Sequence, residues 1–204
     1  MSLTGAVLAV LVLATVAAIA VLASHPGALA SRRGKALAAV IFLVLPAAVS
    51  GVGVMAHLEE AKSTDFCLSC HVMKPYGESL LYEDAAFVPA VHYQNNLVPR
   101  ERACFTCHTT YTLFGDVKAK LNGLRHVWVY YSGQTPEKLA LYQPYANREC
   151  LNCHAKARSF LEGGLHADVM PDLLSNKTPC KDCHEQFHDV AAVGSHAKWQ
   201  GAAP

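Results

Sequence analysis

The sequence predicts a mainly α-helical chain with much irregular structure, in which two N-terminal apolar helices precede a small polar domain. Two observations support this fold class. Of the 204 residues, the first 56 carry only three charged side chains, whereas the rest of the chain is polar with charges of both signs. The polar part also repeats one short pattern of cysteine and histidine four times. We therefore expect those four sites, rather than a conventional apolar core, to organise its fold.

The two apolar segments cover about residues 5–23 and 36–56. Each is long enough to cross a hydrocarbon core of about 30 Å at a rise of about 1.5 Å per residue. Pro46 lies inside the second segment, and we expect it to kink that helix. Residues 1–57 are therefore predicted to form a membrane part with two transmembrane helices.

The connection at residues 31–35 indicates the orientation of these helices. It contains Arg32, Arg33 and Lys35, and no lysine or arginine precedes it. The positive-inside rule places such a connection in the cytoplasm, so the N-terminus and the polar domain are expected on the periplasmic side of a bacterial inner membrane. The alternative is a cleaved signal peptide, because Ala28–Ala30 resembles a cleavage site. The missing positive charge before the first apolar segment favours a retained helix.

All eight cysteines belong to four copies of C-x-x-C-H, the attachment signature of c-type haem. In such a motif both thiols bind the haem vinyl groups and the histidine binds the iron. The cysteines are Cys67 and Cys70 in the first motif, Cys104 and Cys107 in the second, Cys150 and Cys153 in the third, and Cys180 and Cys183 in the fourth. Four covalently bound haems are therefore expected, with His71, His108, His154 and His184 as iron ligands.

Other interpretations of this pattern explain it less well than haem attachment. A C-x-x-C pair can form half of a zinc site or a redox disulfide, but neither explains a histidine directly after the second cysteine in every copy. The fourth motif also contains His184-Glu-Gln-Phe-His188, a zinc-protease pattern, although His184 is already committed to haem. We expect a periplasmic tetrahaem domain over residues 58–188, followed by a separate tail over residues 189–204. The net charge of +1 gives no indication of a nucleic-acid partner.

Low-potential haems usually take a second histidine on the distal side. The favoured candidates are His92, His166 and His188, which lie near the second and fourth motifs. His196, in the tail, is interpreted as a solvent-exposed histidine. Met73 follows the first motif as C-H-x-M, and it either replaces the motif histidine at the iron or packs on the edge of the porphyrin.

Several of these stretches together resemble the NapC/NirT family of membrane-anchored tetrahaem cytochromes, including the NrfH-type subunits. The stretches are residues 63–73 around the first motif, His92 before the second, residues 116–126, and His166 and His188 around the fourth. The resemblance covers about residues 40–189. It implies a quinol dehydrogenase, which takes electrons from membrane quinol and passes them through four haems to a periplasmic reductase.

The resemblance also implies roles for individual residues. The first haem would face the quinol, with Met73 as its ligand, and the other three haems would use His92, His166 and His188. Lys118 or Lys120 resembles the lysine of the family's quinol site. Asp116 is a further candidate for carrying protons in the same region. Trp128, Tyr130 and Tyr131 are interpreted either as an interfacial aromatic belt or as residues that pack on a haem.

This chain departs from the family pattern in two places. The family usually has one membrane helix, so the additional helix is expected to contact another integral subunit or a second protomer. If that subunit oxidises the quinol, this chain is only an electron conduit and anchor. NrfH-type members also carry an acidic residue after a Gly-x-Arg sequence, where this chain has His126 after Gly123-Leu-Arg125. His126 is therefore a candidate sixth ligand of the first haem, or a proton acceptor beside it.

Overall fold

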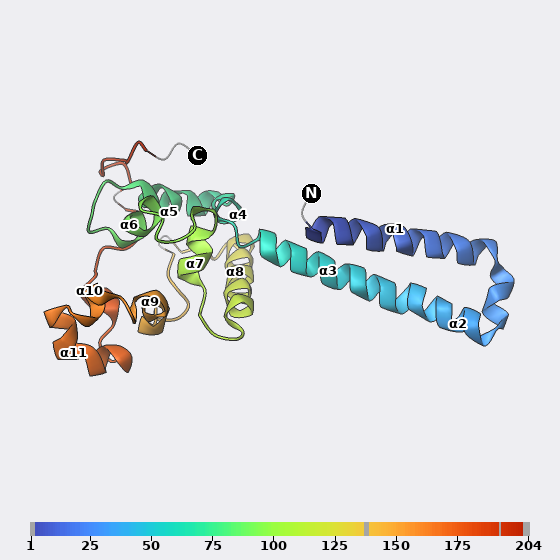
Figure 1. Cartoon of the computed structure of the whole chain (residues 1–204). Helices are drawn as coiled ribbons and strands as arrows, with labels where there is room; N and C mark the ends of the chain where they lie inside the picture. The colour runs from blue at the N-terminus through green and yellow to red at the C-terminus, as the bar shows by residue number, and fades with distance from the viewer. Residues whose placement is uncertain (1–2, 137–138, 192, 202–204) are drawn as a thin grey trace. The chain divides into compact units, whose positions relative to one another are not determined.

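The computed structural model describes residues 3–136, 139–191 and 193–201, which fold into helices joined by irregular segments (Figure 1). No strand forms in these described residues, where an isolated antiparallel bridge joins Tyr82 and Lys198. The chain divides into two compact units, one ending at Ala61 and one beginning at Lys62. The predicted fold class, mainly helical with two apolar N-terminal helices, is confirmed.

The first unit is a pair of helices. Helix α1 covers Leu3–Ser24, and a 3₁₀ turn at Pro26–Ala30 leads to α2 at Arg32–Ala39. A π-helical turn at Val40–Val44 continues without a break into α3 at Leu45–Glu60, which runs beside α1 (Figure 1). Both helical runs are long and apolar enough to cross a membrane. Most of their large side chains are exposed, as expected for surfaces that meet lipid.

The basic residues between the two apolar segments do not lie in a loop. Ser31 caps α2, because its hydroxyl accepts a hydrogen bond of 3.0 Å from the backbone N–H of Gly34. Arg32, Arg33 and Lys35 therefore form the first turn of α2, where a connecting loop was predicted. The positive charges remain at the turn where the chain passes from the first apolar helix to the second.

Pro46 is accommodated by the backbone that precedes it. Proline has no N–H to donate, which removes one hydrogen bond from an α-helical ladder. In the turn just before Pro46 the helix widens, and the N–H of Leu45 donates to the carbonyl of Val40 in a π-helical bond. The second apolar segment thus stays one continuous helical run.

Within its described residues, the second unit contains eight short or medium helices. They are α4 at Thr64–Leu68, α5 at Lys74–Glu78, α6 at Val88–Gln94, α7 at Ala103–His108, α8 at Gly115–Tyr131, α9 at Asn147–His154, α10 at Arg158–Leu161 and α11 at Gly164–Leu174. The longest, α8, has 17 residues. Irregular segments and short 3₁₀ turns, including those at His71–Met73 and Cys180–Asp182, connect them.

A small aromatic cluster supports this unit at one end. Tyr82, Phe87 and Ala90 are almost fully buried, and the ring of His196 stacks on Tyr82 with centroids 4.2 Å apart. The backbone N–H of Trp199 donates to the carbonyl of Leu81 at 2.7 Å. The described part of the C-terminal segment therefore packs back onto the domain. His196 is half-buried there, and its interpretation as a solvent-exposed histidine was wrong.

Candidate functional site

The four motifs lie on helices or at helix ends, and none of the eight cysteines, all of them in described residues, forms a disulfide. Cys67 is in α4 and the first motif ends in the following 3₁₀ turn, whereas the second motif fills most of α7. The third motif forms the last turns of α9, and the fourth begins in a 3₁₀ turn. A helical C-x-x-C places both sulfurs on one side of the backbone, because residues three apart are neighbours on a helix.

A buried polar side chain joins the first motif to the second. Thr64, the first residue of α4, donates to the carbonyl of Arg100 at 2.7 Å and accepts from the N–H of Ala103 at 2.9 Å. The thiols of Cys67 and Cys104 consequently meet in a hydrogen bond, which lowers the pKa of Cys67 to about 7 with a further contribution from Lys120. The two attachment sites are therefore adjacent.

The second and third motifs are joined in a similar way. The hydroxyl of Tyr145 donates to the carbonyl of Cys107 at 2.6 Å, and the N–H of Tyr111 donates to the buried carboxylate of Glu149 at 3.0 Å. Burial and the nearby thiol of Cys153 raise the pKa of Cys107. These contacts bring the end of α7 against α9.

Asn147 joins the third motif to the fourth. Its side-chain amide donates to the carbonyls of Leu173 and Thr178 at 2.9 and 2.7 Å, and its oxygen accepts from the N–H of Cys180 at 2.7 Å. Its side chain is almost completely buried. The thiols of Cys150 and Cys180 are hydrogen-bonded as a result. The four motifs are thus connected in their order along the chain.

Three motif histidines each face a histidine from a distant segment. The ring centroids are 5.8 Å apart for His92 and His154, 6.2 Å for His108 and His188, and 6.3 Å for His166 and His184. A metal–imidazole bond is about 2 Å long, so two rings that share one metal ion have centroids roughly 6 Å apart. The three pairs fit an iron between them. Since His184 and His188 belong to different pairs, the zinc-protease interpretation of that stretch finds no support.

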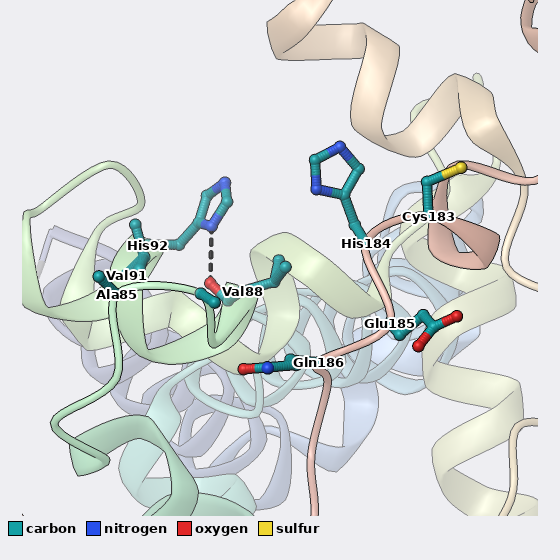
Figure 2. A pocket seen from close by; sticks show the side chains of 9 residues that line it. Ala85, Val88, Val91, His92, Cys183, His184, Glu185 and Gln186 are labelled. Carbon is teal, nitrogen blue, oxygen red and sulfur yellow. Dashed lines mark hydrogen bonds between the residues drawn. The ribbon is translucent and has the colours of Figure 1, made fainter. Parts of the chain in front are cut away.

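A cavity of about 410 Å³ opens between α6 and the fourth motif. Figure 2 shows His92 on one side of this cavity and His184 beside Cys183 on the other. Its volume lies within the usual range of cofactor sites. The cavity therefore offers space for a cofactor beside the fourth motif, while His92 on its other wall also faces His154 of the third motif.

The three distal candidates differ in what their second ring nitrogen contacts. His92 Nδ1 lies 2.8 Å from the carbonyl of Val88, to which it donates (Figure 2). His188 Nδ1 lies 2.7 Å from the hydroxyl of Ser79, whose own hydrogen is given to the carbonyl of Tyr76. His188 Nδ1 must then donate, which leaves Nε2 unprotonated for a metal. His166 Nδ1 has no hydrogen-bond partner, the one such buried side-chain atom among the described residues.

The environment of these rings favours their neutral form. Burial, with a further contribution from His108, lowers the pKa of His188 to about 4. Burial also lowers the pKa of His108 and of His154. An imidazole must be neutral to bind a metal ion, so this part of the domain presents its histidines in the state that ligation requires.

The first motif has different surroundings. His71 faces the ring of Tyr130 from α8, with centroids 5.5 Å apart, and no histidine ring is paired with it in the described part of the chain. Met73 lies in the 3₁₀ turn that follows Cys70, and its side chain is half-buried. His126 is one helical turn before Tyr130 on α8, and it contacts Tyr142.

His126 and Tyr142 form a small cluster with Arg125. The two rings stack with centroids 4.6 Å apart, and the Tyr142 hydroxyl lies 3.2 Å from His126 Nδ1. The Arg125 guanidinium lies 3.9 Å from the centre of the Tyr142 ring. Burial and the positive charge of Arg125 lower the pKa of His126. The ring nitrogen that faces Tyr142 is therefore Nδ1, and Nε2 lies on the other side of the ring.

Two lysines and a carboxylate gather beside the first two motifs. Lys62 Nζ lies 2.8 Å from Asp116, and the ammonium groups of Lys62 and Lys120 lie 5.3 and 4.8 Å from the centre of the Phe105 ring. The bond from Lys62 lowers the pKa of Asp116. Of the predicted quinol-site residues, the structure thus brings Asp116 and Lys120 together. Lys118 is two residues from Lys120 on a helix and so faces another side.

The comparisons with known proteins agree with this geometry. The description "NapC/NirT cytochrome c family, N-terminal region" matches residues 30–192, which is most of the chain. The chain belongs to the NapC/NirT cytochrome c family. It is accordingly a membrane-anchored c-type cytochrome of an electron-transfer family, with covalently bound haem c.

This NapC/NirT cytochrome has several characterised relatives. It is 26% identical to cytochrome c-type protein NapC of Haemophilus influenzae over 179 residues, which cover 78% of this chain and 85% of that protein. It is 31% identical to cytochrome c-type protein TorC of Escherichia coli K12 over 76% of this chain, but it spans only 43% of that protein. The NapC of Escherichia coli K12 is 24% identical over 63% of this chain and 68% of its own length. No solved structure matches the chain at a significant level.

Sequence reasoning missed several residues of this cytochrome that lie outside the motifs and hold motif residues in place. Thr64, Asn147 and Tyr145 connect neighbouring motifs, and Ser79 orients His188. None of them belongs to a motif, and each works through a contact with a residue far away in the chain. A pattern in one sequence carries no signal for such contacts.

Proposed function

We propose that this NapC/NirT cytochrome oxidises membrane quinol and passes the electrons, one at a time, through four haems to a periplasmic reductase or cytochrome. A c-type haem, when bound, supplies an iron that takes up and gives back a single electron. The observation that carries the proposal is the contrast among the motifs. His108, His154 and His184 each face a histidine, whereas His71 faces Tyr130.

The histidine pairs support a ligand assignment that the sequence left open. His188 would bind the second haem together with His108, His92 the third together with His154, and His166 the fourth together with His184. The eight motif cysteines would attach the four haems. Two neutral imidazoles saturate an iron and favour electron transfer over the binding of a further ligand.

The contacts between motifs support a route for the electrons. Thr64, Tyr145 and Asn147 hold each motif against the next one in the chain. Cysteines that lie this close to one another would hold the haems attached to them close together, and close approach favours electron transfer between haems. The route would therefore run from the first motif to the fourth.

The surroundings of the first motif favour it as the quinol end. Lys120 lies close enough to Cys67 in α4 to lower its pKa, and the ammonium groups of Lys62 and Lys120 lie over Phe105 of α7, the helix that Thr64 holds against the first motif. A lysine ammonium can donate a hydrogen bond to a quinol oxygen, and a carboxylate can receive a proton. Met73 remains the expected iron ligand here, with His71 as the alternative. His126 has Nε2 available, either for a proton of the quinol or for the first iron.

The basic first turn of α2 supports the orientation. Arg32, Arg33 and Lys35 form the start of the second of the two helical runs that can cross a membrane, so this turn would remain in the cytoplasm. The N-terminus and the haem domain would then lie in the periplasm. The proposed partner is a soluble reductase or cytochrome on that side.

A second candidate is a conduit and anchor subunit, in which a partner oxidises the quinol. The observation that favours it is α1, an apolar helix beyond the single one that the family usually has, whose side chains are mostly exposed. Such a helix offers a surface for another integral subunit or a second protomer.

One experiment separates the two candidates. The purified full-length cytochrome is mixed with a water-soluble quinol analogue in detergent, and haem reduction is followed by absorbance. Reduction by the quinol supports quinol oxidation by this chain itself. If a strong chemical reductant reduces all haems but the quinol reduces none, the conduit role replaces the first proposal.

A further inference from the structure

One side of α8 is apolar and exposed along its whole length. The side chains are spaced alternately three and four residues apart, which places them in one stripe. Each is between 54% and 82% exposed. They are Phe114, Val117, Leu121, Leu124, Trp128 and Tyr131. We call this set the α8 stripe.

The α8 stripe does not face the haem motifs. At 3.6 residues per turn, Ala119, His126 and Tyr130 lie on the opposite side of the helix from the stripe. On that opposite side Tyr130, although 41% exposed, contacts His71 of the first motif. Gly115 is buried there, and a side chain at this position would overlap the carbonyl of Thr110. A haem on the first motif would therefore cover the opposite side and leave the stripe exposed.

Basic residues border the stripe on both edges. Lys118 and Arg125 follow one edge, and Lys120 lies at the other. Asp116 is the acidic residue of this helix, and Lys62 neutralises it. A helix with leucine and aromatic residues on one face and lysine and arginine beside them is typical of helices that lie in a membrane interface. In such helices the long basic side chains can reach lipid headgroups while their aliphatic stems cover apolar surface. Here the Lys120 ammonium lies over the Phe105 ring and the Arg125 guanidinium over the Tyr142 ring, so both charges stay beside the helix.

The start of α8 is bonded to a residue that closely follows a membrane-spanning helix in the sequence. Lys62 is two residues after Glu60, the last residue of α3, and two residues extend at most about 7 Å. The Lys62 side chain is only 16% exposed and bonds to Asp116 in the first turn of α8 at 2.8 Å. A helix whose first turn is tied to the end of a membrane span begins at the level of the lipid headgroups.

We propose that α8 is an interfacial helix, whose stripe inserts into the boundary between headgroups and acyl chains of an anionic membrane. This contact holds the first haem motif, on the other side of α8, at the height where a lipid-soluble substrate arrives. The proposal depends on membrane anchoring and on no quinol chemistry. Its failure is therefore distinguishable from a failure of the proposed function.

The test uses the full-length cytochrome with its haems attached, so that an introduced cysteine is the free thiol. Leu124→Cys places it in the stripe, and Leu174→Cys on α11 is the matched control, because these leucines are 64% and 62% exposed. Each variant is reconstituted into lipid nanodiscs of phosphatidylethanolamine and phosphatidylglycerol with one chain per disc. The rate of labelling by a water-soluble polyethylene glycol maleimide is then measured. Leu121→Cys is a second stripe position, and the haem spectrum reports folding of every variant.

We expect the stripe cysteines to react about tenfold more slowly than the control, because the bilayer excludes the reagent. In discs with a photoreactive group on the acyl chain, illumination should attach lipid to the α8 peptide. Equal labelling rates overturn the proposal. Protection that appears only with two chains per disc, without lipid adducts on α8, also overturns it and assigns the stripe to a second copy of the chain.

Discussion

The first motif and the other three share one five-residue pattern, yet the folded chain surrounds them differently. In three motifs the histidine faces another histidine at 5.8–6.3 Å, supplied by α6, by α11 or by the segment after the fourth motif. In the first motif it faces a tyrosine of α8. The pattern determines where a haem attaches. The residue on its far side, which comes from a distant segment, determines whether the iron is saturated or remains open to other chemistry.

The largest expected effect comes from breaking one histidine pair. His188→Ala removes the ring that faces His108, so one haem should change from a low-spin to a high-spin absorption spectrum while all four remain attached. His196→Ala is the matched control, since its ring stacks on Tyr82 and is not paired with a motif histidine. A spectrum that stays fully low-spin in His188→Ala would remove this residue from the ligand set.

The next effect concerns the contact between the third and fourth motifs. Asn147→Ala leaves two carbonyls and the Cys180 N–H without their partners in a buried site. The free energy of unfolding should fall by roughly 2–4 kcal/mol, which chemical denaturation followed in the haem absorbance would measure. Asn95→Ala, on an exposed residue with one local hydrogen bond, should cost much less. Equal losses would mean that Asn147 does not hold the paired motifs together.

The sequence was sufficient for everything that local patterns encode. The attachment sites, the apolar helices and the mainly helical fold class follow from spacing and composition, and the structure confirms the fold class. The start of the second helical run was predicted too late. Ser31 caps α2 one residue before the basic residues, which therefore form a helical turn where a loop was predicted. The sequence alone did not indicate which distal histidine faces which motif histidine. His92 is nearer in sequence to the second motif but faces the third, since α6 and α9 come together only in the folded chain.

The first motif can be tested through its charged neighbours. Lys120→Met removes one proposed donor to the quinol, and the KM for quinol should rise about tenfold, the usual cost of one charge-assisted hydrogen bond. Because the haems are unaffected, reduction by a strong chemical reductant should not change. Lys118→Met, on another side of α8, is the control and should leave KM within about twofold. If both variants behave alike, the cluster at Phe105 is not the quinol site.

The smallest expected effect distinguishes the three histidine pairs from one another. Ser79 is fully buried and accepts a hydrogen bond from His188 Nδ1, whereas His166 Nδ1 has no such partner. An Nδ1–H that donates makes the imidazole a stronger donor to a ferric iron and so lowers the reduction potential. Ser79→Ala should therefore raise the midpoint potential of one haem and destabilise the fold by about 1 kcal/mol. Potentiometric titration would measure the shift, with Ser132→Ala as control, because that exposed hydroxyl makes the same type of bond to a carbonyl three residues earlier. A potential that moves equally in both variants, or in neither, would show that this hydroxyl only supports the backbone and does not tune its haem.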